Sequence, residues 1–169
     1  MSILKTTDFA SGYTKIATDQ YTDTDLATFL VDKKLYSIIK RIMGDELGQA
    51  FIDDLTGDPA VPTTAKWITI WGDFEAVVDD IPFYCLGLKN ILVYLTYCDF
   101  VSQQSIVNIS TGNKSINQEA ANTEGLMKKS VVVNNRAVEA VRYLQLYLDD
   151  NPTDYPNFDG CNFDYQSML

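Results

Sequence analysis

No histidine occurs among the 169 residues of the chain. Histidine is the commonest general base in enzymes, and Ser-His and Cys-His nucleophile pairs depend on it, so its absence excludes many enzyme classes. The sequence also lacks the glycine-rich loops that bind nucleotides and the GxSxG motif of hydrolases. We therefore expect a protein that is not an enzyme and that carries no cofactor.

Cysteine is also scarce. Cys85, Cys98 and Cys161 form no CxxC pair, and without histidine they make no zinc-binding pattern. We interpret them as ordinary reduced residues of a cytosolic product.

Positive charge and long apolar runs are limited as well. Lys and Arg total 13 against 23 Asp and Glu, which gives a net charge of -10. Because DNA binding depends on cationic side chains that displace counterions, we expect no specific nucleic-acid binding. The N-terminus lacks the pattern of a signal peptide, and no apolar run approaches the roughly 20 residues that span a bilayer. We expect a soluble protein without a membrane partner, made in the cytoplasm.

Apolar residues at helical spacing dominate the rest of the sequence. They predict helices from residue 23 or 24 to 43, from 45 to 55, from about 83 to 105, and from between 118 and 124 to 150. Residues 65–82 predict a helical turn followed by an extended segment, and 108–117 a short hairpin or a projecting loop. The predicted fold class is mainly α. It is a bundle of about four helices over residues 23–150, with an extended arm at 1–22 and an extended tail at 151–169, all in one domain.

The predicted helix that begins near residue 83 is apolar nearly all round. Leu88, Ile91 and Leu95 lie on one side, while Tyr94 and Tyr97 lie on others. Such a helix must be covered nearly all round. It lies either at the centre of a bundle or in an interface with a neighbouring subunit.

Aromatic residues supply the candidate interaction sites. Those of the arm are Phe9, Tyr13 and Tyr21, and those of the tail are Tyr155, Phe158, Phe163 and Tyr165. Aromatic anchors in polar segments often dock one chain into a pocket on another, although arm and tail can equally fold back onto their own domain. Trp67 and Trp71, one helical turn apart, predict a core or subunit contact. Their acidic surroundings argue against stacking on single-stranded bases.

Three acidic pairs, Asp53-Asp54, Asp79-Asp80 and Asp149-Asp150, are the remaining candidates for chemistry. Carboxylate oxygens are ligands for magnesium or calcium. However, adjacent carboxylates on a helix point about 100 degrees apart, and no pair extends into a calcium-binding loop. We interpret the pairs as solvated charge and expect no metal site.

One stretch carries a family resemblance. It consists of GLKNILVYLTYCDFV at 87–101, the NISTG turn at 108–112, a second long helix, and an ending with Asn151-Pro152 and then Tyr155-Pro156-Asn157-Phe158-Asp159-Gly160. Over most of the chain, from about Asp23 to Gly160, this pattern resembles the head-to-tail connector (neck or adaptor) proteins of tailed bacteriophages, in particular those infecting Bacteroides-like hosts. The likeness consists of the helix pattern and scattered glycine, tyrosine and proline positions.

The resemblance implies a structural virion protein made in the bacterial host. Such a subunit is repeated in a ring, commonly of twelve copies, that joins the portal to the tail and lines the DNA passage without specific binding. Its arm or tail reaches the portal protein, a neighbouring copy or the next tail or neck protein. By the same analogy, Thr111 and Gly112 lie in a loop that projects toward the channel or a partner ring. Two alternatives stay open: an enzyme that uses carboxylates and a divalent metal, and a small helical binding module for a host protein.

Overall fold

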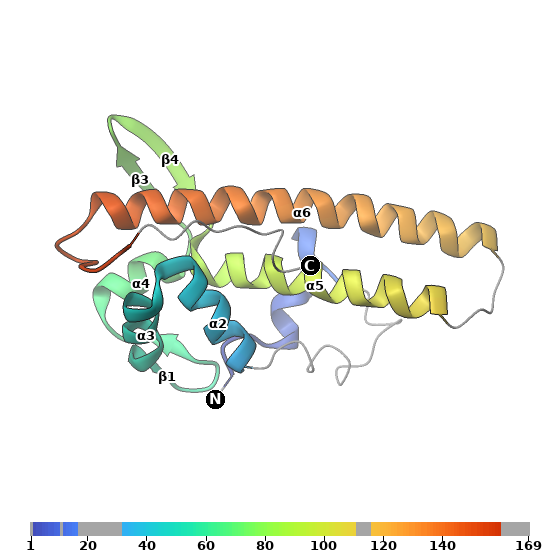
Figure 1. Ribbon diagram of the computed structural model, residues 1–169, viewed down its shortest axis with the longest axis horizontal. Coiled ribbons are helices and arrows are strands. Elements are labelled where there is room, and N and C mark those ends of the chain that lie inside the picture. Colours follow the sequence, from blue (N-terminus) through green and yellow to red (C-terminus); the bar gives the residue numbers. More distant parts are fainter. Residues whose placement is uncertain (1, 11, 17–31, 111–115, 160–169) are drawn as a thin grey trace.

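The computed structural model describes residues 2–10, 12–16, 32–110 and 116–159, with the backbone alone at 13, 32–33, 103–110 and 116–127. Its longest elements are helices α5 (Gly87–Ser110) and α6 (Ile116–Asp150), which lie side by side along the long axis of the molecule (Figure 1). Shorter helices pack near one end of this pair. The described chain is thus mainly α, as the sequence predicts.

The contact between α5 and α6 follows from their apolar patterns. Side chains of α6 at spacings of three and four residues are fully buried: Val133, Ala137, Val141, Leu144 and Leu148. This spacing places them on one helical face. They are the stripe expected from the sequence of the last helix.

Helix α5 is buried on several sides within the chain. Leu88, Ile91 and Leu95 are buried on one side, and Val93 and Tyr97 are buried on others. Helix α6, helix α4 (Ala65–Trp71) and two N-terminal 3-10 turns all contact α5. The described part of α5 is therefore the centre of the molecule. Among the described residues, no helix combines the length and the apolar character that a membrane crossing requires.

Helices α2 (Asp32–Met43) and α3 (Asp45–Asp54) meet at Gly44, whose φ of 87° suits glycine. They approach closely at Gly48, where a Cβ atom would lie 2.8 Å from the Cα atom of Lys40. The sequence predicts the end of the first helix and the start of the second at this point. The predicted start at Asp23 or Thr24 lies outside the described residues.

The link from α3 to α4 is a small hairpin of β1 (Leu55–Thr56) and β2 (Val61–Pro62). The Asp54 carboxylate accepts hydrogen bonds from the backbone N–H groups of Thr63, at 2.7 Å, and Thr64, at 2.9 Å. Burial raises the pKa of Asp54, but hydrogen bonds from Thr64 and Thr63 outweigh burial and lower this pKa to about 2. Asp54, from the acidic pair Asp53-Asp54, thus holds the residues at the start of α4 in place.

The N-terminal segment differs from the predicted extended arm. Its described residues form 3-10 turns η1 (Thr6–Phe9) and η2 (Gly12–Thr14), and its apolar residues Ile3, Leu4, Phe9 and Ile16 are buried. These residues belong to the hydrophobic core although their sequence spacing is that of neither a helix nor a strand.

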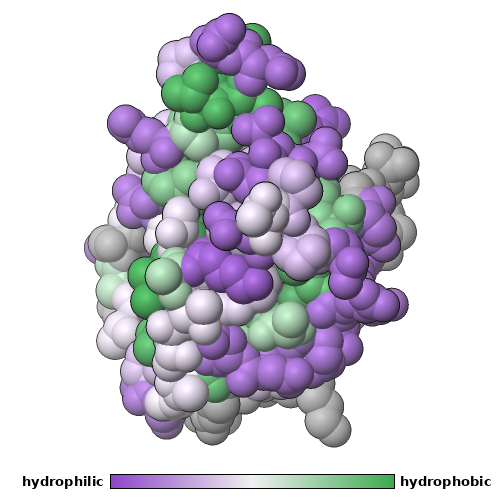
Figure 2. All heavy atoms as spheres, turned by 90° about the vertical axis from the view of Figure 1, so that its left-hand side faces the viewer, coloured by the Kyte–Doolittle hydropathy of each residue, from purple (hydrophilic) through white to green (hydrophobic). Residues whose placement is uncertain are grey.

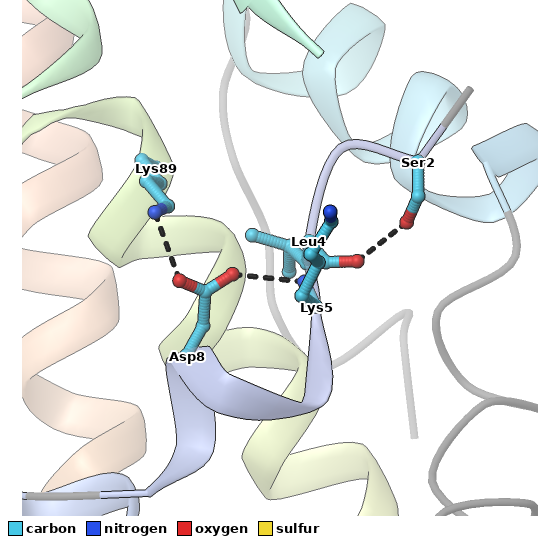
Figure 3. Close-up of polar contacts among 5 residues, drawn as sticks. All are labelled: Ser2, Leu4, Lys5, Asp8 and Lys89. Atoms are coloured by element: carbon cyan, nitrogen blue, oxygen red, sulfur yellow. Dashed lines mark hydrogen bonds and ion pairs between the residues drawn. The ribbon is translucent and has the colours of Figure 1, made fainter. Parts of the chain in front are cut away.

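Figure 3 shows how polar contacts hold this segment. The Asp8 carboxylate accepts a hydrogen bond from the Lys5 backbone N–H at 2.9 Å and pairs with the ammonium of Lys89, on α5, at 2.8 Å. The Ser2 hydroxyl donates to the carbonyl of Leu4. The segment from residue 2 to 10 is thus attached to the body by polar as well as apolar contacts.

The tail also differs from an extended segment in its described part, residues 151–159. The Tyr155 backbone N–H donates to the carbonyl of Asn151 at 3.0 Å, which closes a turn directly after α6. The buried Tyr155 hydroxyl donates to the Lys66 carbonyl at 2.7 Å, so this turn is held against α4. Burial and the neighbouring Tyr147 raise the pKa of Tyr155.

The boundaries of the two long helices differ from prediction at three places. Helix α5 begins at Gly87, later than expected, because Ile81–Cys85 form strand β4. It continues to Ser110, so the first three residues of the predicted loop at 108–117 are helical, and α6 begins earlier than expected, at Ile116. The helical turn and extended segment predicted at 65–82 are confirmed as α4 followed by β3 (Phe74–Val78).

Candidate interaction surface

Strands β3 and β4 form an antiparallel hairpin that projects beyond α6 (Figure 1). Phe74 pairs with Cys85 and Val78 with Ile81, which leaves Asp79 and Asp80 as a two-residue turn. Both have positive φ, 50° and 63°. Two such residues are typical of a type I′ turn, whose twist matches that of the flanking strands. The acidic pair at 79–80 is therefore the turn of a tight hairpin.

Aromatic contacts anchor the base of the hairpin to α6. The Phe74 ring lies 4.8 Å from the Tyr147 ring, and the Phe83 ring stacks on Tyr143 at 5.3 Å, measured between centroids. Tyr143 and Tyr147 are one helical turn apart, so one face of α6 receives both strands. Each aromatic pair is worth about 0.5–1.5 kcal/mol beyond the area that it buries.

Gly87 closes the base where β4 turns into α5. Its φ is 74°, and a Cβ atom there would lie 1.9 Å from the carbonyl oxygen of Gly72, which joins α4 to β3. No side chain fits at this distance. The two ends of the hairpin therefore meet backbone to backbone, and the Tyr84 hydroxyl adds a hydrogen bond of 2.7 Å to Asp73 at the same end.

The rest of the hairpin exposes large apolar side chains. The exposed fractions are 60% for Val77, 66% for Ile81 and 52% for Tyr84. Figure 2 shows hydrophobic atoms gathered on the uppermost projection of the molecule, below a hydrophilic tip. Exposed apolar side chains grouped on one projection are typical of a contact surface.

The hairpin is also acidic. Residues 67–88 contain four acidic residues, Asp73, Glu75, Asp79 and Asp80, and no Lys or Arg. Its surface therefore combines apolar side chains with a local charge of one sign. This combination favours a partner surface that is apolar and basic.

The predicted interaction sites whose aromatic side chains the structure describes lie largely inside the subunit. Trp67 and Tyr155 are buried with ring centroids 5.7 Å apart, and Phe51 lies 5.5 Å from Trp67 and 5.8 Å from Trp71. Helices α3 and α4 and the tail thus share one aromatic cluster. In this structure, Trp67 and Tyr155 are core residues of their own chain.

The other predicted sites fall into two groups. Phe9 is buried, and Phe158 is half-buried against the core. The structure does not describe the Tyr13 side chain, and five further predicted sites lie outside the described residues: Tyr21, Thr111, Gly112, Phe163 and Tyr165.

In the described part of the chain, no group of three or more His, Cys, Asp or Glu side chains could hold a metal ion. The Asp54 carboxylate accepts hydrogen bonds from Thr63 and Thr64. Asp79 and Asp80 form the hairpin turn, and Asp149 and Asp150 are exposed at the end of α6.

Sequence reasoning missed the exposed apolar residues of the hairpin. The usable signal was two five-residue runs, FEAVV and IPFYC, separated by exactly two residues that tolerate positive φ. Asp-Asp is a weaker hairpin signal than Asn-Gly or Asp-Gly, because neither residue is glycine.

Comparison of the chain with protein-family models, with curated proteins and with solved structures found no match.

Proposed function

We propose that this chain is a structural subunit that assembles with further copies of itself into a ring in a bacteriophage neck, between the portal and the tail. The observation that supports it best is the β3–β4 hairpin. This projection carries Val77, Ile81 and Tyr84 at exposed fractions of 52% or more, on a body whose other described apolar residues mostly lie in the core.

A closed ring requires two unlike surfaces on each subunit, because each copy presents one surface to the preceding copy and another to the next. A rigid projection is suited to be one of them. The aromatic contacts to α6 and the close approach at Gly87 hold this hairpin before a partner binds. A surface that is already ordered loses little conformational entropy on association.

The charge of the chain agrees with a position around passing DNA. A net charge of -10 repels phosphate, so a wall of such subunits lets DNA move without specific binding. The helical body, proposed as a bundle of about four helices, forms the wall. The portal protein and the next neck or tail protein are the proposed partners above and below it.

Electron microscopy of purified virions tests this proposal. We expect density for several copies of this chain, arranged around the axis between head and tail. Virions that lack the chain, although infected cells produce it, would contradict the proposal.

A further inference from the structure

We infer that the β3–β4 hairpin of one copy docks on residues 128–136 of α6 in a second copy. The inference rests on the proposed function, since it names the two surfaces through which neighbouring copies meet. Charge and exposed apolar area on the two surfaces support it.

The hairpin supplies the projecting surface. Val77 and Ile81 lie at its far end on opposite faces, since Val77 pairs with Pro82 and Ile81 with Val78. Both are more than half exposed, so the end of the hairpin, and not one of its faces, makes the contact. Asp79 and Asp80, at the turn, add negative charge beside these apolar side chains. A fitting partner surface is apolar and bordered by cations.

Helix α6 carries such a surface in its first half. Val131 is 58% exposed and Val132 is 48% exposed, on neighbouring positions of the helix. Residues 125–138 contain Lys128, Lys129 and Arg136 and no acidic residue. Three other large apolar residues on the described part of the body are exposed: Val61, Ile68 and Leu146. None of them lies in such a basic stretch.

One of these cations is held in place. The Lys129 ammonium lies 5.1 Å from the centre of the Tyr97 ring and 3.4 Å from the carbonyl oxygen of Lys15. These contacts bind the ammonium to its own chain, so they hold this part of α6 against α5 and the N-terminal segment before a partner binds.

The two surfaces do not meet within one copy. Val77 and Ile81 are exposed in the same molecule in which Val131 and Val132 are exposed. The base of the hairpin contacts α6 at Tyr143 and Tyr147, so it lies roughly 16 Å along the helix from Val132 at a rise of 1.5 Å per residue. The contact is therefore between copies, and because it joins two unlike surfaces it allows the head-to-tail arrangement that a ring requires.

The overall negative charge does not prevent such a contact. At physiological ionic strength, charges more than about 8 Å apart are largely screened. Close to the contact, Asp79 and Asp80 at the hairpin turn meet a stretch of α6, residues 125–138, that contains basic residues and no acidic residue. Unlike charges at the contact therefore attract each other, while salt screens the repulsion between distant negative charges.

Two double variants test the inference by sedimentation equilibrium of the full chain. The hairpin variant is Val77→Asn with Ile81→Asn, and the helix variant is Val131→Asn with Val132→Asn. The matched control is Val61→Asn with Ile68→Asn, since these side chains are 45% and 53% exposed on other elements. Asparagine removes apolar contact without adding charge. Circular dichroism melts verify that each variant keeps its fold.

We expect the hairpin and helix variants each to raise the dissociation constant of self-association at least about tenfold, and the control to change it less than about threefold. A mixture of the hairpin and helix variants retains one intact contact, between the hairpin of the helix variant and α6 of the hairpin variant. The mixture is expected to form a 1:1 dimer and nothing larger.

Wild-type chain that stays monomeric at millimolar concentration overturns this inference. Self-association that survives either double variant, or a mixture that forms no dimer, overturns it too. None of these results contradicts the proposed function, which the virion experiment tests separately. A ring of this chain in virions would still support that function if another surface joined the copies.

Discussion

Replacing Gly87 by alanine is expected to destabilise the fold by about 2–5 kcal/mol. The φ of 74° alone costs an L-residue about 1–2 kcal/mol. The new Cβ atom would also lie 1.9 Å from the Gly72 carbonyl oxygen, and this contact is with backbone, which cannot rotate away. Forcing the backbone apart adds about 1–3 kcal/mol, as in overpacked cores. Because domains are stable by only about 5–15 kcal/mol, this is a large fraction of the total.

Urea unfolding followed by circular dichroism measures the effect, with Gly12→Ala as the control. Gly12 has nearly the same φ, 71°, but nothing lies within 4 Å of the position of its Cβ atom. The control is expected to cost only the backbone term, about 1–2 kcal/mol. Equal losses for Gly87→Ala and Gly12→Ala would refute the close approach at the base of the hairpin.

Three further predictions concern the core, the tail and acid stability. Leu144→Ala, at a fully buried position of α6, is expected to lower the free energy of unfolding in urea by about 2–5 kcal/mol. Leu146→Ala, at a half-exposed position, is expected to lower it by less than about 0.5 kcal/mol. Similar losses of stability for the two variants would contradict the placement of the α6 stripe. Tyr155→Phe removes the hydrogen bond to the Lys66 carbonyl and is expected to lower stability by about 1 kcal/mol, and an unchanged midpoint would argue against this contact. The pKa of Asp54 is lowered from 3.8 to about 2, so its charged form stabilises the fold above pH 4, and this contribution is lost as pH falls from about 4 to 2. The difference in the free energy of unfolding between wild type and Asp54→Asn is about 1 kcal/mol or less, because the site is well solvated. It is expected to shrink as pH falls over that range, and a pH-independent difference would contradict the role assigned to Asp54.

Much of the helical structure could be predicted from the sequence because local signals agree with the final packing. The α6 stripe from Val133 to Leu148 has helical spacing, and Gly44 marks the junction of α2 and α3. Within the described residues, these elements differ from prediction only at their ends.

The N-terminal segment and the hairpin could not be predicted in the same way. The burial of Ile3 and Phe9 depends on contacts with residues far along the chain, such as the pairing of Asp8 with Lys89, which no local pattern encodes. The sequence leaves Trp67 between a core and a subunit contact, and Tyr155 between docking on another chain and folding back, because aromatic residues serve both cores and interfaces. Only the three-dimensional contact between their rings assigns them to the core.

We propose that this chain acts as one of many touching copies in a particle. Quantitative mass spectrometry of purified virions, with the portal protein as the internal reference, measures the copy number most directly. We expect a whole number of copies of this chain for each portal ring, as a complete ring requires. Absence from the virions, or a trace amount far below one ring per particle, would contradict it.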